Sequence, residues 1–423
     1  MALPRVPSEA NELSISDKNS SSDSCMSWNQ LTTIIEDLDP SLVPSPSSPE
    51  AKRLVIVGDV HGHLAELKKL LQDIQFDRDH GDHLIFVGDL IVKGPDSSGV
   101  VQLAMDLGAS AVRGNNEDRV LAAYAAMKRD PDLKKIADQE SAPFIKDGDK
   151  AAEPQKAENG VESRDPASLK RYSADRDFST AASLTEAQVS WLASRPLILR
   201  IPPLKGAVAP PWNAGSILVA HAGLVPSLPL EEQDQWAVMN MRTLAYLDPD
   251  AKDEAIQADL AKGVRSRVRR FIAFGDASED EIKAKWAQWA DLVDEGRGYS
   301  AIYRDGCVPQ PVEGRDGDAW VDAWNRAQNA MELSEQRTVV IYGHDARAGV
   351  QINPEVEYPG ETAGAPAVKG TRYAFGLDSG CVYGNQLSAL VIARSSDGQG
   401  ISHSIVQVNS TEVKEDNAEG KAS

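Results

Sequence analysis

The sequence contains few cysteines and no long apolar run. Only Cys25, Cys307 and Cys381 occur in 423 residues. Three scattered cysteines exclude a disulfide framework and a cysteine-rich zinc site. No stretch approaches the roughly 18 apolar residues that a membrane helix needs, and the first residues lack the apolar core of a signal peptide. We therefore expect a cytoplasmic globular protein with no membrane span.

Positive charge is also scarce. Lysine and arginine total 44 against 64 aspartates and glutamates, which leaves a formal net charge of −20. Such an acidic chain repels polyanions at long range, so no nucleic-acid partner is expected. The chain also lacks a GxxxxGK[ST] phosphate loop and a Cys-x5-Arg loop. These absences argue against P-loop nucleotide enzymes and cysteine-dependent phosphatases.

Three stretches have the composition of disordered chain, because they hold too little apolar surface to offset the entropy of ordering. Residues 1–51 are rich in Ser, Pro and Asp, residues 130–184 form a polar, low-complexity insertion, and residues 409–423 form an acidic tail. The remaining span, 52–408, is expected to be one domain. Within it, residues 231–335 are expected to form a mainly helical cap region.

Short β-branched runs alternate with helical periodicity between residues 53 and 129. This pattern predicts an α/β fold with parallel strand order in that half. The predicted strands are 53–58, 83–88 and 109–114, and the predicted helices are 64–74, 100–107 and 117–129. Later predicted strands are 197–201, 216–220, 338–343, 372–378, 388–395 and 402–408.

Polar residues follow five of these strands at the point where each strand ends. Ligands gather at the carboxyl ends of strands in α/β sheets, so the side chains should converge. Carboxylate, imidazole and amide donors without cysteine suit Mn, Fe, Zn or Co. Six ligands suit two metals that share a carboxylate. The six candidates are Asp59, His61, Asp89, Asn115, His221 and His344.

Each candidate has a simpler interpretation when taken alone. An Asp or Asn after a strand often caps the next helix, and a single histidine is more often an ordinary half-buried residue. The repetition favours the metal site, because one order recurs five times: an apolar strand, then Gly or Ala, then a candidate ligand.

Six motifs occur in a fixed order and together resemble the calcineurin-like metallophosphatases. Within that superfamily the chain is most similar to the symmetrical dinucleoside-tetraphosphatases and their eukaryotic relatives, which include fungal zinc-dependent endopolyphosphatases. The resemblance covers most of residues 53–408. Its motifs are GDVHG (58–62), GDLIVKGPDS (88–97), RGNNE (113–117), VAHAGLVP (219–226), YGHDAR (342–347) and LDSGCVYGNQLSAL (377–390).

The resemblance implies a four-layer α/β/β/α sandwich and two divalent metal ions, Zn, Mn, Fe or Co. It assigns one metal to Asp59, His61 and Asp89, with Asp89 bridging to a second metal. The second metal would be held by Asp89, Asn115, His221 and His344. The implied reaction is hydrolysis of phosphoanhydride bonds, in polyphosphate or a dinucleoside polyphosphate, by in-line attack of a metal-bridging hydroxide. Some fungal relatives are vacuolar, which is the alternative location.

The chain departs from the family pattern at two catalytic positions. Lys93 stands where most members have Arg, and Asn116 stands where the usual general-acid His is expected, with Val92 in place of its partner Asp. A phosphate leaving group, with a pKa of roughly 6, departs with little protonation, whereas an alkoxide does not. We therefore expect a preference for anhydrides. The alternatives are a Ser/Thr phosphatase-like phosphomonoesterase and a weakly active or inactive metal-binding relative.

Several basic residues are candidates for substrate contacts, although each also suits a surface or structural role. Lys93 is the first candidate, and the weaker candidates are Arg113, Arg119, Arg242 and Arg347. The basic stretch 262–271 would suit a long polyanionic substrate, but a solvated helix face is its default interpretation.

Overall fold

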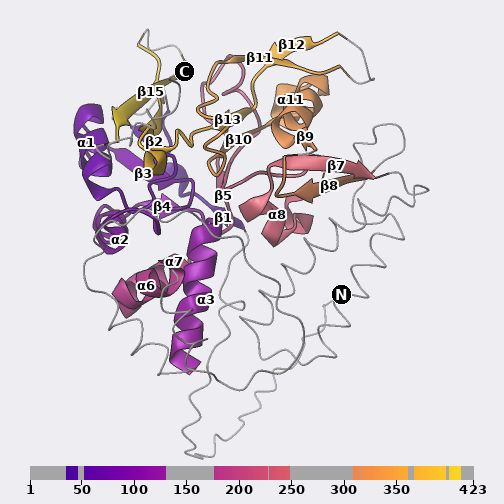
Figure 1. Ribbon diagram of the computed structural model, residues 1–423. Coiled ribbons are helices and arrows are strands. Elements are labelled where there is room, and N and C mark those ends of the chain that lie inside the picture. The colour runs from indigo at the N-terminus through magenta and orange to yellow at the C-terminus, as the bar shows by residue number, and fades with distance from the viewer. Residues whose placement is uncertain are drawn as a thin grey trace, which may run out of the picture.

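The computed structural model describes residues 35–45, 52–129, 176–226, 228–247, 308–315, 317–360, 366–396 and 400–410. Two five-stranded sheets form the centre of the molecule (Figure 1). The first has the order β15-β14-β2-β3-β4, with β2 Arg53–Val57, β3 Asp82–Phe86, β4 Ser110–Ala111, β14 Gln386–Arg394 and β15 Ile401–Asn409. The second has the order β1-β5-β6-β10-β13, with β1 Ile35–Asp37, β5 Ile198–Ile201, β6 Ser216–Ala220, β10 Thr338–Tyr342 and β13 Ala374–Gly376.

Strand β2 shows how the layers are built. Leu54 and Ile56 pack into a core shared with the second sheet, whereas Val55 and Val57 pack into a core shared with helices. This alternation follows from the two-residue period of a strand. The helices on that outer face are α1 Leu64–Ile74, α2 Ser97–Asp106, α3 Asn115–Arg129, α6 Arg176–Ser183 and α7 Glu186–Ala193.

The second sheet is covered on its own side by α11, which spans Trp320–Ala330. Trp320 packs edge-on against Tyr342 of β10, with ring centroids 4.9 Å apart. Figure 1 shows α1 and α2 on one side of the sheets and α11 on the other. The order of layers is therefore helix, sheet, sheet, helix, which confirms the predicted α/β/β/α sandwich.

Strand direction explains where a site can form. Strands β2, β3 and β4 run parallel, as predicted, and the sheet becomes mixed because β14 is antiparallel to β2. In the second sheet β6 and β10 are parallel. The carboxyl ends of parallel strands share an edge, so the loops after these five strands meet between the sheets.

The expectation of a disordered tail through residue 51 is wrong for residues 35–45. Strand β1 pairs in parallel with β5, and Leu38 and Val43 are buried in the core between the sheets. Asp37 of β1 also forms an ion pair with Arg200. Composition missed this strand because its partner lies some 160 residues away. Residues 1–34 and 46–51 lie outside the described part, as do residues 411–423 of the predicted acidic tail.

The predicted insertion 130–184 also needs a correction at its end. Residues 176–183 form α6, which packs against α3, and Arg119 of α3 pairs with Asp177 of α6 at 2.8 Å. Residues 130–175 lie outside the described part.

The mainly helical expectation for residues 231–335 missed a small sheet in the part that the structure describes. Alongside α8 Gln235–Asn240 and α11, strands β7 Thr243–Leu247, β8 Val308–Val312 and β9 Asp318–Ala319 form a separate sheet in the order β8-β7-β9. Pro309 and Pro311 hid β8 from the sequence pattern, because proline is tolerated in sheets mainly on an edge strand, which β8 is. Residues 248–307 and 316 lie outside the described part.

Two further strands, β11 Glu355–Tyr358 and β12 Val368–Thr371, form an antiparallel pair. Within the described ranges, none of the helices has the length and apolar character needed to cross a membrane.

Candidate metal centre

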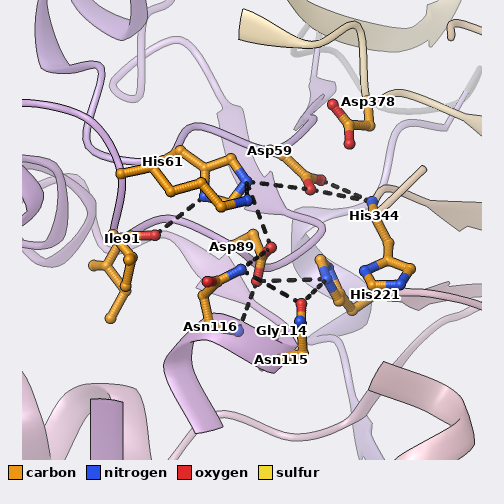
Figure 2. Close-up of polar contacts among 12 residues, drawn as sticks. Asp59, His61, Asp89, Ile91, Gly114, Asn115, Asn116, His221, His344 and Asp378 are labelled. Carbon is orange, nitrogen blue, oxygen red and sulfur yellow. Dashed lines mark hydrogen bonds and ion pairs between the residues drawn. The ribbon is translucent and has the colours of Figure 1, made fainter. Parts of the chain in front are cut away.

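The six predicted ligands come together between the two sheets (Figure 2). Their ligand atoms form two groups, in each of which the atoms lie within 4.8 Å of one another, and Asp89 belongs to both. This division matches the two predicted metal positions. The first group is Asp59, His61 and Asp89, and the second is Asp89, His221 and His344, with Asn115 beside it.

Each histidine ring is oriented by a backbone carbonyl. One ring nitrogen donates to that carbonyl, so the other nitrogen carries a lone pair toward the cluster. In His61 and His221 the nitrogen that faces the cluster is Nε2. It lies 3.5 Å from the carboxylate of Asp89 in His61 and 3.4 Å from it in His221. The oriented pairs are His61 Nδ1 with Ile91 O at 3.2 Å, His221 Nδ1 with Val87 O at 2.9 Å, and His344 Nε2 with Asn240 O at 3.1 Å.

Asn115 adds one amide group to the cluster. Its side-chain amide lies 3.1 Å from Nε2 of His221 and faces the carboxylate of Asp89. Without a metal, the amide orientation that satisfies these groups is the one in which its NH₂ donates to Asp89 and His221, whereas a bound cation would favour the orientation with Oδ1 turned inward. Because the ring hydrogen of His221 is committed to Val87, lone pairs of His221 and Asp89 converge beside this amide. A divalent cation is the group that such a donor set accommodates, so these residues fit the implied metal.

The pKa shifts of the buried groups also favour a bound cation. Burial raises the pKa of Asp59 well above its usual range, and the nearby carboxylates of Asp378 and Asp89 raise it further. Burial likewise raises the pKa of Asp378 to about 6. Burial lowers the pKa of His61 to about 4, so this imidazole is neutral at pH 7. Crowded carboxylates beside neutral imidazoles are an environment that a cation stabilises.

The backbone around the centre is strained in a way that local sequence does not favour. Among the described residues, six that are not glycine have a positive φ, and five of these lie in the site. Strained backbone clusters at functional sites because surrounding packing must hold it. The five are His61 (48°), Asp89 (51°), Val92 (70°), Lys93 (74°) and His344 (68°).

Steric crowding explains why glycine directly precedes two of the candidate ligands. A Cβ on Gly114 would collide with the carboxylate of Asp89, and a Cβ on Gly343 would collide with that of Asp59. The recurring order of strand, small residue and ligand therefore reflects the space that neighbouring ligands occupy.

Glu117 is a residue of the site that the sequence analysis missed. Its fully buried carboxylate accepts from the backbone N–H groups of Gly114, Asp89 and Leu90, each at 2.8 Å, and from Ile91 at 3.3 Å. It thereby joins the loop after β3 to the start of α3. Its position at the end of the RGNNE motif, in the first turn of α3, was the available signal.

Asn116 is held on both sides. Its Nδ2 donates to Oδ2 of Asp89, its backbone N–H donates to Oδ1 of Asp89 at 3.0 Å, and its Oδ1 accepts from Arg119 at 2.9 Å. Arg119 is fixed in turn by two bonds to Asp177. The amide of Asn116 has no titratable proton to give.

The basic candidates lie in three places: at the edge of the centre, along a neighbouring cavity, and buried away from that cavity. Lys93 is exposed and its Nζ donates to Nε2 of His61 at 3.0 Å, at the edge of the centre. Arg242 and Arg347 line a cavity that also includes His344. Arg113 is not among the residues that line that cavity; it is buried and donates to the carbonyl of Ala193 at 3.0 Å. The basic stretch 262–271 lies outside the described residues.

Parts of the chain are similar to known proteins. A family model described as calcineurin-like phosphoesterase matches residues 52–356. A symmetrical bis(5'-nucleosyl)-tetraphosphatase of Pectobacterium carotovorum is 44% identical over 91 residues, which are 21% of this chain and 32% of that protein. Serine/threonine-protein phosphatase 1 of Salmonella typhimurium is 45% identical over 71 residues, 17% of this chain and 32% of that protein. The chain thus spans about a third of the length of these curated relatives.

A solved structure described as a candidate diadenosine tetraphosphatase is 24% identical to the chain, with a TM-score of 0.44. The alignment covers 89% of this chain and 98% of that one.

Proposed function

The chain belongs to the calcineurin-like phosphoesterase family, whose model covers residues 52–356, and from this premise we propose that it hydrolyses phosphoanhydride bonds at a two-metal centre. The observation that carries the proposal is the pair of buried ligand groups that share Asp89. The substrates proposed are polyphosphates and dinucleoside polyphosphates. The similarity to tetraphosphatases over 91 residues supports this class.

The ligands would divide as their positions suggest. Asp59 and His61 would hold one divalent ion, Asn115, His221 and His344 would hold the other, and Asp89 would contact both. When bound, the two metals supply an activated water and neutralise charge on the phosphate. The carbonyls that orient the three imidazoles keep the metal-binding nitrogens turned inward before any metal arrives.

Lys93 and two arginines would bind the substrate. Lys93 stands beside His61 with an exposed ammonium, a compact charge that can contact a phosphate oxygen at the edge of the centre. Arg242 and Arg347 lie on the cavity side, near His344, where further phosphates of the same substrate would extend.

Asn116 supports the choice of anhydride over ester. It occupies the position of the family's general acid, and its amide is hydrogen-bonded to Asp89 and Arg119. Without a proton donor there, a leaving group must depart as an anion. A phosphate does so readily because its relevant pKa is roughly 6, whereas an alkoxide does not.

A phosphomonoesterase is the second candidate, because the chain is also similar to a serine/threonine-protein phosphatase over 71 residues. The test is a substrate panel with purified protein loaded with Mn, Co, Zn or Mg. Inorganic tripolyphosphate and diadenosine tetraphosphate should be hydrolysed at least tenfold faster than a phosphoserine peptide. Faster hydrolysis of the peptide would overturn the anhydride assignment, and an absence of turnover with every metal would overturn the enzyme assignment. Asp89→Asn is the matched control, since it removes the shared ligand.

A further inference from the structure

A cavity of about 730 Å³ opens beside the metal centre. His344 forms part of its wall, so the cavity is continuous with the second ligand group. Its volume lies in the range of sites that bind whole small molecules. The other lining residues that matter here are Arg242, Arg315, Arg347, Tyr383 and Asn385.

The three arginines give the cavity its charge. Arg242 donates to the backbone carbonyl of Glu313 at 3.1 Å, and Arg315 forms an ion pair with Asp345. These contacts hold two guanidinium groups in place, and Arg347 is exposed to solvent. Glu313 also lies 3.9 Å from Nη1 of Arg242, so each of the two acidic residues that line the cavity faces one arginine, and Arg347 supplies the excess positive charge. A chain of phosphates is the kind of ligand that this lining favours.

A ligand made only of phosphates would not account for the exposed ring of Tyr383. Tyr383 is 62% exposed, and it is the only aromatic residue among the large apolar residues that are exposed in the described ranges. Exposing a ring to water forgoes the stability that its burial would contribute. An exposed ring at the edge of a charged cavity is instead typical of a binding surface.

The turn that carries Tyr383 is well fixed. It is the short helix η5, Cys381–Tyr383, placed between Gly380 and Gly384, both with φ near +73° (73° and 72°). The backbone N–H of Tyr383 donates to the carbonyl of Gly380 at 2.9 Å, and Cys381 is buried. The ring therefore stands on a rigid support, which reduces the entropy lost when a ligand stacks on it.

The same turn packs against the loop after His344. The position that a Cβ on Gly380 would take lies 3.6 Å from Cδ2 of Tyr383 and 3.7 Å from Cβ of Ala346. Ala346 directly precedes Arg347, and both Arg347 and Tyr383 line the cavity.

We propose that Tyr383 is a stacking platform for a nucleobase, and that the cavity takes a nucleoside polyphosphate whose phosphates pass the arginines to reach the metal centre. This inference rests on the proposed function and names its substrate class. Every base has a π face, so an aromatic platform accepts different bases. Linear polyphosphate has no base and would gain nothing from Tyr383.

The test compares Tyr383→Ala with Tyr383→Phe. Alanine removes the ring, whereas phenylalanine keeps the π face and removes only the hydroxyl. Leu333→Ala is a control, since Leu333 is 51% exposed and does not line the cavity. For diadenosine tetraphosphate, Tyr383→Ala should raise KM about tenfold, and Tyr383→Phe should stay within about twofold of the wild type. Hydrolysis of inorganic tripolyphosphate should change less than about twofold in every variant.

Binding provides a readout that does not need turnover. With manganese-loaded protein, calorimetric titration should show about tenfold weaker binding of adenosine diphosphate to Tyr383→Ala and unchanged binding of inorganic pyrophosphate. If the wild type hydrolyses no anhydride but this difference in Kd is found, the proposed function fails and the nucleotide site stands. Equal effects on both ligands, no effect on either, or a Tyr383→Phe variant as weak as Tyr383→Ala would each overturn the stacking proposal.

Discussion

At the scale of single residues, the centre combines ordinary ligands with an unusual neighbour. Asn116 ties Asp89 to Arg119, so a position that carries a proton donor in most of the family here carries a fixed amide. Lys93 stands next to His61 with a compact charge instead of a guanidinium fork. Both departures leave the six candidate metal ligands unchanged, and under the proposed function they would affect the leaving group and the bound phosphate of the substrate.

Asn116→His should restore a general acid at this position. General acid catalysis contributes about 10²–10⁴-fold where the leaving group needs a proton. We expect hydrolysis of a phosphoserine peptide to rise at least tenfold, while hydrolysis of tripolyphosphate changes by less than about threefold. Steady-state kinetics on both substrates measures the difference, with Asn116→Gln as the variant that keeps an amide. An equal rise on both substrates would show that Asn116 limits the reaction for another reason.

At the scale of elements, the site depends on loops that follow different strands. Four backbone N–H groups from the loop after β3 and the start of α3 donate to one carboxylate, that of Glu117. A buried N–H group without an acceptor costs about 1–3 kcal/mol. Glu117 is therefore a positioning residue, because it fixes the backbone that carries Asp89 and Asn115.

Glu117→Gln should loosen this junction. The amide keeps one acceptor oxygen and brings an NH₂ group toward backbone donors, so the variant should lose about 1–3 kcal/mol of unfolding free energy. Metal affinity should fall as well, because Asp89 moves with its loop. Denaturant unfolding and competition with a chelating dye measure the two quantities, and Glu335→Gln, on the surface, is the control. Unchanged metal affinity in a destabilised variant would limit Glu117 to a role in folding.

At the scale of the whole molecule, the proposed substrate is an anion, although the chain carries a formal net charge of −20. The local charge differs from the global one. Arg242, Arg315 and Arg347 gather on one side of the centre, Lys93 lies at its edge, and the buried carboxylates would be neutralised by divalent ions. Long-range repulsion is screened within about 8 Å at physiological salt, so this local field decides binding.

Removal of metal should destabilise the folded protein. Asp59, Asp89 and Asp378 are buried together, and without a cation their mutual repulsion is offset only in part by Lys93 and by hydrogen bonds such as that from the backbone N–H of His344 to Asp59. Chelation should lower Tm by several degrees, and the addition of Mn or Zn should restore it. Thermal unfolding with parallel elemental analysis should show two ions per chain. Asp89→Asn should bind fewer ions and show a smaller Tm response, and a Tm that ignores chelation would contradict a structural contribution of the metals.

Strands and helices with strong periodicity were predictable because the pattern that marks them is local. The helix 64–74 and the strand 216–220 have the predicted boundaries, and the fold family followed from motifs read in order. Strands that depend on distant pairing partners were not predicted. Strand β1 is stabilised by β5, and β8 is a proline-containing edge strand supported by β7.

The sequence by itself determined which candidate ligand follows each strand and that these residues converge, since the carboxyl ends of parallel strands share one edge of a sheet. Only the tertiary structure decided which other side chains reach the centre. Packing between segments far apart in the chain buried Arg113, bonded Glu117 to the loop of Asp89, and brought Tyr383 and Arg347 to one cavity. Local patterns carry no information on such distances, because they depend on how the two sheets and their loops pack against each other.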